Sequence, residues 1–309
     1  MLVSYQEVVE AHRKIGPFVH RTPVISSNYL NERVGADVFF KCENLQKVGA
    51  FKARGAVNAV LSLSDADAGR GVITHSSGNH GQAVAYACAI RGVKATIVVP
   101  EGASSVKVDA IRGYGAEIEF APQADRESRV AELVAAGGMV IVHPFNDRAV
   151  IAGQGTAALE LFEDIPDLDV VVVPVGGGGL ASGSAVVASE VGADVVGVEP
   201  EVVDDAFRSL RDGTLYGATG ARSVGDGLLT GLGDITFSIL SRSGASVVLV
   251  SESEIVEAMR LVATRMKVVV EPSGATVVAG LLRYASQFSG LRVGAVFSGG
   301  NVDLAGFAP

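Results

Sequence analysis

The sequence predicts an α/β fold of two lobes, each a mostly parallel, twisted sheet flanked by helices. Short apolar segments typical of strands alternate with helical segments along most of the 309 residues, and this order predicts parallel sheets. The segment at residues 170–173 is apolar throughout, as expected for a strand buried on both faces of its sheet. The chain is 48% apolar and 19% charged, a composition that allows a sizeable buried core.

The first half of the chain predicts a helix and a strand, followed by a regular alternation. Ser4 and Glu7 have the spacing of a capping box at the start of a helix that ends near Lys14. A short apolar strand is predicted at residues 38–40. The alternation then predicts strands at 72–74, 95–99, 117–120 and 139–142, with helices at 82–90, 106–112 and 127–136.

The second half of the chain predicts a further series of strands and helices. Ser251 and Glu254 again have capping-box spacing, and a helix is expected after Pro272. The stretch at residues 212–234 is glycine-rich and irregular, which indicates a functional loop. Strands are predicted at 170–173, 195–198, 245–250 and 293–297, and a helix at 148–162 precedes the first of them.

These two series define the two lobes. We expect residues 53–147 to form a small substrate-side domain, and residues 1–52 with 148–309 to form a large cofactor-binding domain. Ligands of open parallel sheets bind beyond the carboxyl ends of the strands. Three turns rich in Gly, Ser and Asn follow predicted strands and should face the cleft between the lobes: 76–81, 176–179 and 298–301.

The charge and composition exclude several classes of protein. The formal net charge is −9 and no run of Lys and Arg occurs, so we expect no nucleic-acid partner. No apolar run approaches the roughly 20 residues of a membrane span, and the N-terminus lacks an apolar signal core. We therefore expect a cytoplasmic protein without a membrane partner. Cys42 and Cys88 are expected to be reduced packing residues.

Gly176–Gly179 is a run of four glycines directly after a predicted strand and before a helix. Glycines let backbone N–H groups approach an anion closely, and the helix N-terminus adds a favourable dipole. The run has neither the Walker lysine nor the spaced glycines of a dinucleotide fingerprint, which argues against a nicotinamide-dependent dehydrogenase. A single phosphate is the predicted ligand, and an ordinary flexible turn is the alternative.

The turn Ser76-Ser77-Gly78-Asn79-His80-Gly81 is a second candidate ligand site. It offers two hydroxyl groups, an amide and backbone donors at the start of a helix. These groups suit a carboxylate or a ring hydroxyl, although the same residues would also form an ordinary helix N-cap.

Lys52, between Phe51 and Ala53, lies in a segment with few charges. An isolated lysine is usually a solvated surface residue. A lysine amine that is desolvated or close to other cations instead becomes a nucleophile toward aldehydes. Without such a role, the glycine run would suit a non-catalytic protein that binds a phosphorylated ligand.

Five motifs in the order found here resemble one known family. They are KCENLQKVGAFKARGA around Lys52, SSGNHGQA at 76–83, VGGGGL at 175–180, EPSGA at 271–275 and SGGN at 298–301. The sequence resembles the serine/threonine dehydratase and serine racemase family of fold-type II pyridoxal 5′-phosphate (PLP) enzymes, which are tryptophan synthase β-like. The resemblance extends from His20 to Asn301, and it implies PLP, a small amino-acid substrate and a homodimer or homotetramer.

The resemblance also implies a role for each motif. Lys52 would bind the cofactor covalently and act as the base on one face of the substrate. Phe51 and Asn79 would pack against the cofactor ring and bond its 3-hydroxyl, Gly176, Gly177, Gly178 and Gly179 would bind the phosphate, and Ser298 would bond the ring nitrogen. The substrate carboxylate would be surrounded by Ser76, Ser77, Asn79 and His80.

The implied reaction is removal of water from L-threonine or L-serine, giving a 2-oxo acid and ammonia. The Ser298 hydroxyl would not keep the ring nitrogen protonated, and the weaker electron sink favours elimination. Ser77 resembles the racemase branch of the family, in which a serine at this place protonates the face opposite the lysine. Lys52 and Ser77 would then be paired catalytic residues, and a serine racemase remains an alternative to the threonine/serine dehydratase.

Arg129, in the segment RESR, aligns with an arginine near the substrate side-chain pocket in that branch. It would admit a β-carboxylate, which makes 3-hydroxyaspartate dehydratase a further alternative. A solvated helix arginine is the other interpretation.

Glu199 and Asp205 flank a turn in the segment EPEVVDDA. Two carboxylates suit a hard divalent cation with carbonyl and water ligands, and a pair of exposed acidic residues is the alternative. The resemblance implies that Glu199, the Val203 carbonyl and Asp205 bind Mg²⁺ or Ca²⁺ in a structural or activating site.

Overall fold

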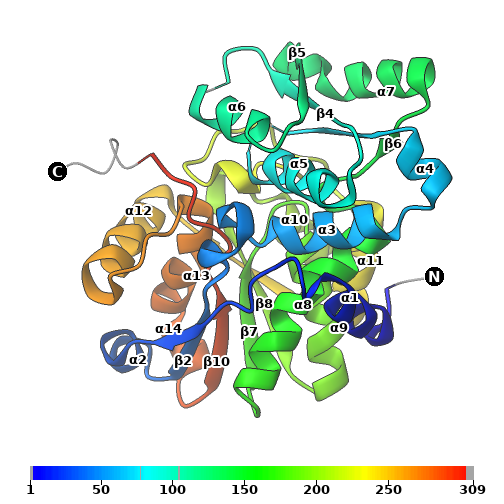
Figure 1. Ribbon diagram of the computed structural model, residues 1–309. Coiled ribbons are helices and arrows are strands. Elements are labelled where there is room, and N and C mark those ends of the chain that lie inside the picture. Colours follow the sequence, from blue (N-terminus) through cyan, green and yellow to red (C-terminus); the bar gives the residue numbers. More distant parts are fainter. Residues whose placement is uncertain (1–2, 77, 104, 304–309) are drawn as a thin grey trace.

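A computed structural model describes residues 3–76, 78–103 and 105–303, which form two lobes, each built on its own sheet (Figure 1). The larger sheet has six strands in the order β1-β2-β10-β7-β8-β9, and the smaller has four in the order β5-β4-β3-β6. Neighbouring strands pair in parallel except β1 with β2, which pair antiparallel. The predicted two-lobe α/β fold is confirmed.

The strands and helices have the following bounds. The strands are β1 (Val24–Ser26), β2 (Asp37–Lys41), β3 (Val72–His75), β4 (Ala95–Pro100), β5 (Glu117–Ala121), β6 (Val140–Ile141), β7 (Val170–Pro174), β8 (Asp194–Pro200), β9 (Ser246–Val250) and β10 (Arg292–Val296). The helices are α1 (Tyr5–Ile15), α2 (Asn28–Val34), α3 (Lys52–Ser62), α4 (Asp65–Gly69), α5 (Asn79–Arg91), α6 (Ser105–Arg112), α7 (Arg126–Gly137), α8 (Arg148–Asp164), α9 (Gly179–Val191), α10 (Asp205–Asp212), α11 (Asp234–Ser243), α12 (Glu252–Leu261), α13 (Pro272–Arg283) and α14 (Ala285–Phe288).

The smaller lobe has the predicted order of elements with shifted boundaries. α5 begins at Asn79, three residues before the predicted start at 82. Polar and small residues in this first turn hide the helical period. The turn packs against the Ser76 carbonyl, and a Cβ on Gly81 would lie only 2.5 Å from that oxygen, so glycine suits this position. The strand predicted at 139–142 is limited to Val140–Ile141.

The larger lobe is organised around β7, whose residues are all buried, as its unbroken apolar sequence predicts. α8 and α9 meet at the backbone level, since a Cβ on Gly183 would overlap the Gly155 nitrogen. This close packing fixes the direction in which α9 leaves β7. Both predicted capping boxes, at Ser4 with Glu7 and at Ser251 with Glu254, are present.

Several short elements had no clear sequence signal. They include β1, α2, α10 and α14, which are between 3 and 8 residues long. Elements this short contain at most about two helical turns, so apolar periodicity is weak. The predicted loop at 212–234 is largely irregular, with one short 3₁₀ turn at Asp226–Leu228.

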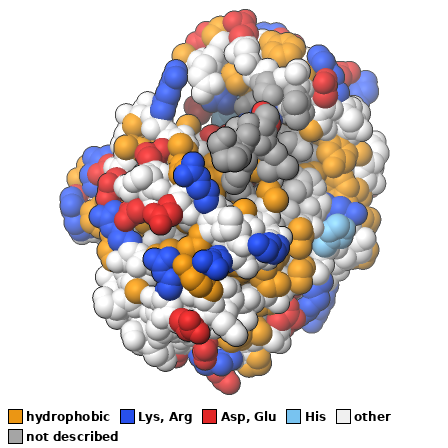
Figure 2. Space-filling model, turned by 90° about the vertical axis from the view of Figure 1, so that its left-hand side faces the viewer, with side chains coloured by type: hydrophobic (Ala, Val, Ile, Leu, Met, Phe, Trp, Pro, Cys, Tyr) orange, Lys and Arg blue, Asp and Glu red, His pale blue; other side chains and the backbone are white. Residues whose placement is uncertain are grey.

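The surface mixes charges of both signs. On the face in Figure 2, Lys and Arg side chains lie beside Asp and Glu side chains, with apolar patches between them. Among the described residues, no helix has the length and apolar character needed to cross a bilayer. Cys42 and Cys88 are free thiols and buried, as predicted, and burial raises the pKa of each to about 12.

Candidate active site

The turns that follow β3 and β10 are joined to each other and to the segment around Lys52. The Phe51 N–H donates to the Ser298 carbonyl at 3.0 Å, and Ala50 forms a β-bridge with Gly299. The turn after β3 joins them, because the Asn301 amide donates to the Asn79 side-chain oxygen at 2.9 Å.

Lys52 is the first residue of α3, and its side chain enters the site between the lobes. Its Nζ donates to the Pro144 carbonyl at 2.8 Å and lies 5.1 Å from the centroid of the Phe51 ring. Desolvation lowers the pKa of Lys52 to about 8, although the Glu271 carboxylate opposes this shift. About a tenth of the amine is therefore uncharged at pH 7 and about half at pH 8, and the uncharged form is the one that a nucleophile or base requires.

The glycine run forms a buried cradle between β7 and α9. A Cβ on Gly177 would overlap the Phe145 ring, and Gly178 has a φ of +82°, so glycine suits both positions. The Thr236 hydroxyl fixes the loop by donating to the Gly177 carbonyl at 2.9 Å. N–H groups in the first turn of α9 have no intrahelical acceptor, so the cradle fits an anion such as a phosphate.

Glu271 is a second ionisable group in the site, and the motifs alone assign it no role. Its carboxylate accepts from the Asn79 amide at 2.8 Å and from the Asn301 N–H at 3.2 Å. Burial raises the pKa of Glu271 to about 7, against the bond from Asn79. A glutamate directly before Pro272 is typical of any helix start, so the sequence pattern did not distinguish it.

Glu271→Gln should flatten the pH dependence of stability. The raised pKa means that the folded chain binds this proton more tightly than the unfolded chain, whose value is near 4.5. Its stabilising contribution is therefore complete below pH 4.5 and lost as the pH rises through about 7, by about 3 kcal/mol at most. Chemical denaturation of the cofactor-free chain from acid to neutral pH measures this loss.

The matched control for that experiment is Glu201→Gln, because the Glu201 side chain is 42% exposed and pairs with Arg283. The control should follow the wild-type curve. An unchanged slope in Glu271→Gln would show that this carboxyl group takes up no extra proton on folding.

His80 is buried beneath the site, and its Nε2 lies 3.0 Å from the Val142 carbonyl. Since a carbonyl only accepts, Nε2 carries the proton and Nδ1 is a buried acceptor without a partner among the described residues. Desolvation and then the Lys52 charge lower the pKa of His80 well below its ordinary value. His80 is therefore neutral beside Lys52.

The predicted ligand residues also include three serines. Ser298 is 2% exposed and lies two residues after the end of β10. The Ser76 hydroxyl accepts from the Gly78 N–H at 3.1 Å. Ser77 lies outside the described residues. The predicted cofactor and substrate roles of these serines remain predictions.

Arg129 lies on α7, and its guanidinium is already paired with acidic side chains. It contacts Glu119 at 2.5 Å and Glu132 at 2.9 Å. Its predicted contact with a substrate carboxylate would require release from Glu119 and therefore remains a prediction.

Glu199 and Asp205 are both fully buried, not exposed as the alternative interpretation supposed. The Glu199 carboxylate accepts from the Ala206 and Phe207 N–H groups at 3.0 and 2.9 Å. Both Asp205 carboxylate oxygens lack a hydrogen-bond partner among the described residues. Desolvation raises the pKa of Glu199 to about 8 and that of Asp205 to about 6.

Within the described part of the chain, no group of three or more His, Cys, Asp and Glu side chains is arranged so that it could hold a metal ion. Glu199 and Asp205 alone would therefore supply the charged ligands of a cation. Because a buried carboxylate without a hydrogen-bond partner, such as that of Asp205, is unfavourable, a hard cation with carbonyl and water ligands fits this position.

A desolvated lysine beside a buried anion cradle, at the carboxyl ends of parallel strands, defines a protein that binds a phosphorylated aldehyde cofactor. The chain belongs to the family of pyridoxal-phosphate dependent enzymes, whose family model matches residues 15–299. This membership and the matching solved structures confirm the resemblance and the fold type inferred from the motifs.

Its relatives include both racemases and lyases. Serine racemase of Dictyostelium discoideum is 46% identical, with 98% of this chain and 96% of the relative aligned, and its crystal structure matches with a TM-score of 0.93. Beta-hydroxyaspartate dehydratase of Paracoccus denitrificans (strain Pd 1222) is 45% identical, with 97% of each chain aligned. The crystal structure of maize serine racemase is 39% identical and matches with a TM-score of 0.96, covering 99% of this chain and 96% of that structure.

Proposed function

We propose that this protein is a PLP-dependent ammonia-lyase that removes water from a small β-hydroxy amino acid, with 3-hydroxyaspartate as its preferred substrate. The supporting observation is the desolvated Lys52 amine, whose partner Pro144 directly precedes Phe145, the residue packed against the buried glycine cradle. The motifs imply L-threonine or L-serine as the substrate. The aligned relatives, which are serine racemases and 3-hydroxyaspartate lyases, favour serine and 3-hydroxyaspartate over threonine.

PLP fits the residues present. Gly176–Gly179 would bind its phosphate, Ser298 its ring nitrogen, and Asn79 and Phe51 its ring. When bound, the cofactor would supply an electron sink that acidifies the α-proton of the substrate.

The side chains of this protein would carry the proton transfers. Lys52 would remove the α-proton of the substrate as a neutral amine. The turn beginning at Ser76 would orient the substrate carboxylate through hydroxyl and backbone donors. Arg129, exchanging Glu119 for the ligand, would bind the β-carboxylate of 3-hydroxyaspartate. Because His80 is neutral, it would not hinder Lys52 from accepting the proton.

Serine racemisation is the second candidate function, favoured by the serine at position 77. A hydroxyl group opposite Lys52 would return a proton to the other face of the substrate. Lys52 and Ser77 would then be two acid–base groups of one site, able to support both reactions.

The test of the proposed function is a steady-state comparison of L-threo-3-hydroxyaspartate, L-serine and L-threonine. We expect the highest kcat/KM for release of a 2-oxo acid and ammonia from 3-hydroxyaspartate. Arg129→Gln should lower this value more than that for L-serine. D-serine formation that far exceeds 2-oxo acid release from every substrate would overturn the lyase assignment in favour of a racemase.

We also propose that Glu199, the Val203 carbonyl and Asp205 bind Mg²⁺ or Ca²⁺. A cation that binds only the folded chain should raise its unfolding temperature. The free energy of unfolding should increase by about 2.7 kcal/mol when the cation concentration is 100 times the Kd. Thermal unfolding with added Ca²⁺ or Mg²⁺ measures the effect, which Asp205→Asn should abolish. Asp204→Asn, which loses only a partly exposed pair with Arg208, is the control, and an equal response of both variants would place the cation elsewhere.

A homodimer or homotetramer remains a prediction from the family resemblance, and light scattering of the purified protein would test it.

A further inference from the structure

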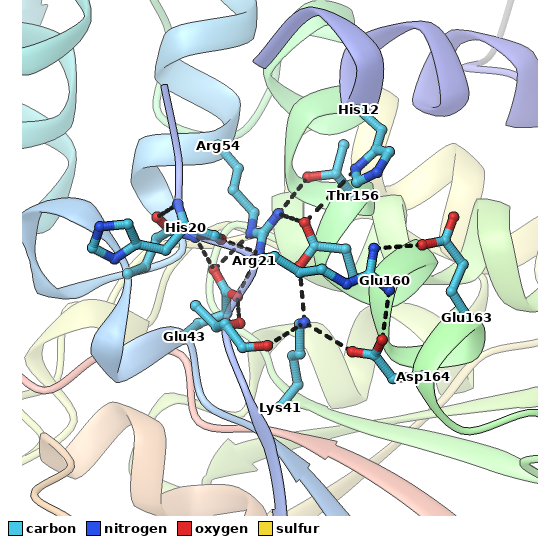
Figure 3. A network of polar contacts seen from close by, with 12 residues as sticks. His12, His20, Arg21, Lys41, Glu43, Arg54, Thr156, Glu160, Glu163 and Asp164 are labelled. Carbon is cyan, nitrogen blue, oxygen red and sulfur yellow. Dashed lines mark hydrogen bonds and ion pairs between the residues drawn. The ribbon is translucent and has the colours of Figure 1, made fainter. Parts of the chain in front are cut away.

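A buried cluster of two cations and two anions includes one residue of the helix that carries Lys52. It consists of Arg54 on α3, Glu160 on α8, Lys41 at the end of β2, and Glu43 in the following 3₁₀ turn (Figure 3). Each of these side chains is at most 2% exposed. We call this set the buried ion cluster.

Arg54 is the centre of the cluster, between the two glutamates (Figure 3). Its Nε and Nη2 donate to the two Glu43 oxygens at 2.7 and 2.8 Å. Its Nη1 and Nη2 donate to the two Glu160 oxygens at 2.8 and 2.7 Å. Further bonds reach the Thr156 hydroxyl and the His20 carbonyl. Two bidentate pairs use the planar fork of an arginine, a geometry that lysine cannot reproduce.

Lys41 completes the charge balance of the cluster. Its Nζ lies 2.8 Å from Glu160 and donates to the Thr22 carbonyl at 2.7 Å. Burial of four charges costs several kcal/mol per ion before pairing, and apolar residues often stabilise such a position as well or better. Stability alone therefore does not account for the cluster, whereas its directional bonds restrict how the joined elements can move.

The cluster joins two separate parts of the chain, residues 41–43 and α8, to the first turn of α3. Arg54 lies two residues after Lys52, so the two side chains leave the helix on nearly opposite sides. Lys52 points toward Pro144 in the cleft, and Arg54 points into the larger lobe. The Arg54 N–H also closes the turn by donating to the Phe51 carbonyl at 3.0 Å. A rotation of this turn would displace Lys52 and break both bidentate pairs.

We propose that Arg54 is a positioning residue for Lys52, and that its paired bonds to Glu43 and Glu160 set the orientation of the first turn of α3. This inference rests on the proposed role of Lys52 as the cofactor-binding amine. Arg54 does not touch the reacting atoms. It acts by fixing the direction from which the amine approaches the cofactor aldehyde.

The test compares Arg54→Lys with a matched control, Arg21→Lys. Arg54→Lys keeps the charge but loses both bidentate pairs. Arg21 pairs with Glu163 and Asp164 at the rim of the same region, where its side chain is 48% exposed. Each full-length protein is loaded with PLP and reduced with borohydride at successive times, and peptide mass spectrometry quantifies the cofactor fixed on Lys52.

A second readout uses no cofactor. The apoprotein is treated with a limiting amount of acetic anhydride across a pH series, and acetylation of Lys52 is quantified by mass spectrometry. The wild-type profile should have its midpoint near the pKa of about 8. In Arg54→Lys the midpoint should move upward, because a displaced amine regains solvent.

We expect Arg54→Lys to form the Lys52 linkage roughly ten to a hundred times more slowly than wild type, and Arg21→Lys to match wild type. A wild-type linkage rate and acetylation profile in a folded Arg54→Lys variant would overturn the inference. If that variant does not fold, Glu43→Gln decides the matter: a rate reduced several-fold supports positioning, and a wild-type rate overturns it. Failure of wild type itself to form a reducible linkage at Lys52 would instead refute the proposed function.

Discussion

Lys52→Ala is expected to abolish the covalent attachment of PLP and to lower turnover of every amino-acid substrate by at least roughly 10³-fold. The variant loses the nucleophile that binds the cofactor aldehyde and the base that removes the α-proton. A positioned general base alone contributes roughly 10² to 10⁴ in rate. Desolvation lowers the pKa of Lys52 to about 8, which prepares this amine to act as a nucleophile and as a base. Among the described residues, Lys52 is the lysine that donates to the Pro144 carbonyl, so no other lysine is expected to replace it.

The measurement combines the visible absorbance of the loaded protein, borohydride trapping and steady-state kinetics. Lys94→Ala is the control, because Lys94 is exposed on the smaller lobe and should behave as wild type. The cradle at Gly176–Gly179 is intact in Lys52→Ala, so the variant should still bind PLP reversibly. A borohydride-stable adduct on another lysine, formed at the wild-type rate, would contradict the assignment of Lys52.

The elements that the sequence predicted correctly are those whose own residues determine them. The valine run of β7 requires burial on both faces, and the capping boxes at Ser4 and Ser251 are local hydrogen-bond patterns. β1 has no such signal, because its three residues are ordered by antiparallel pairing with β2. The start of α5 depends on a contact between Gly81 and the Ser76 carbonyl, which no helical period reveals.

The residues of the site also fall into those that local sequence predicts and those that it does not. The residues predicted from motifs, such as Lys52 and the glycine run, lie in short segments with a distinctive local composition. Glu271 and Arg54 matter through partners that are distant in sequence. Asn79 reaches Glu271 across 192 positions, and Arg54 reaches Glu160 across 106. Such pairings depend on how the lobes pack, so no single segment predicts them.

Ser77→Ala should separate the two reactions proposed for this site. Elimination needs removal of the α-proton by Lys52 and loss of the β-hydroxyl, and neither step requires a proton donor on the opposite face. Racemisation requires such a donor to return a proton there. We therefore expect D-serine formation to fall by at least roughly 10²-fold, the usual contribution of one acid–base group, while 2-oxo acid release changes only a few-fold.

The measurement follows D-serine and pyruvate from the same L-serine reaction, with Ser105→Ala on the exposed start of α6 as the control. Exchange of the α-proton with deuterated solvent shows whether Lys52 still removes this proton, which the product yields alone do not show. Because Lys52 still removes the proton in Ser77→Ala, recovered L-serine should contain deuterium although D-serine is absent. Equal loss of both products, with no deuterium in L-serine, would mean that Ser77 serves substrate binding, and that Lys52 has no partner base at this position.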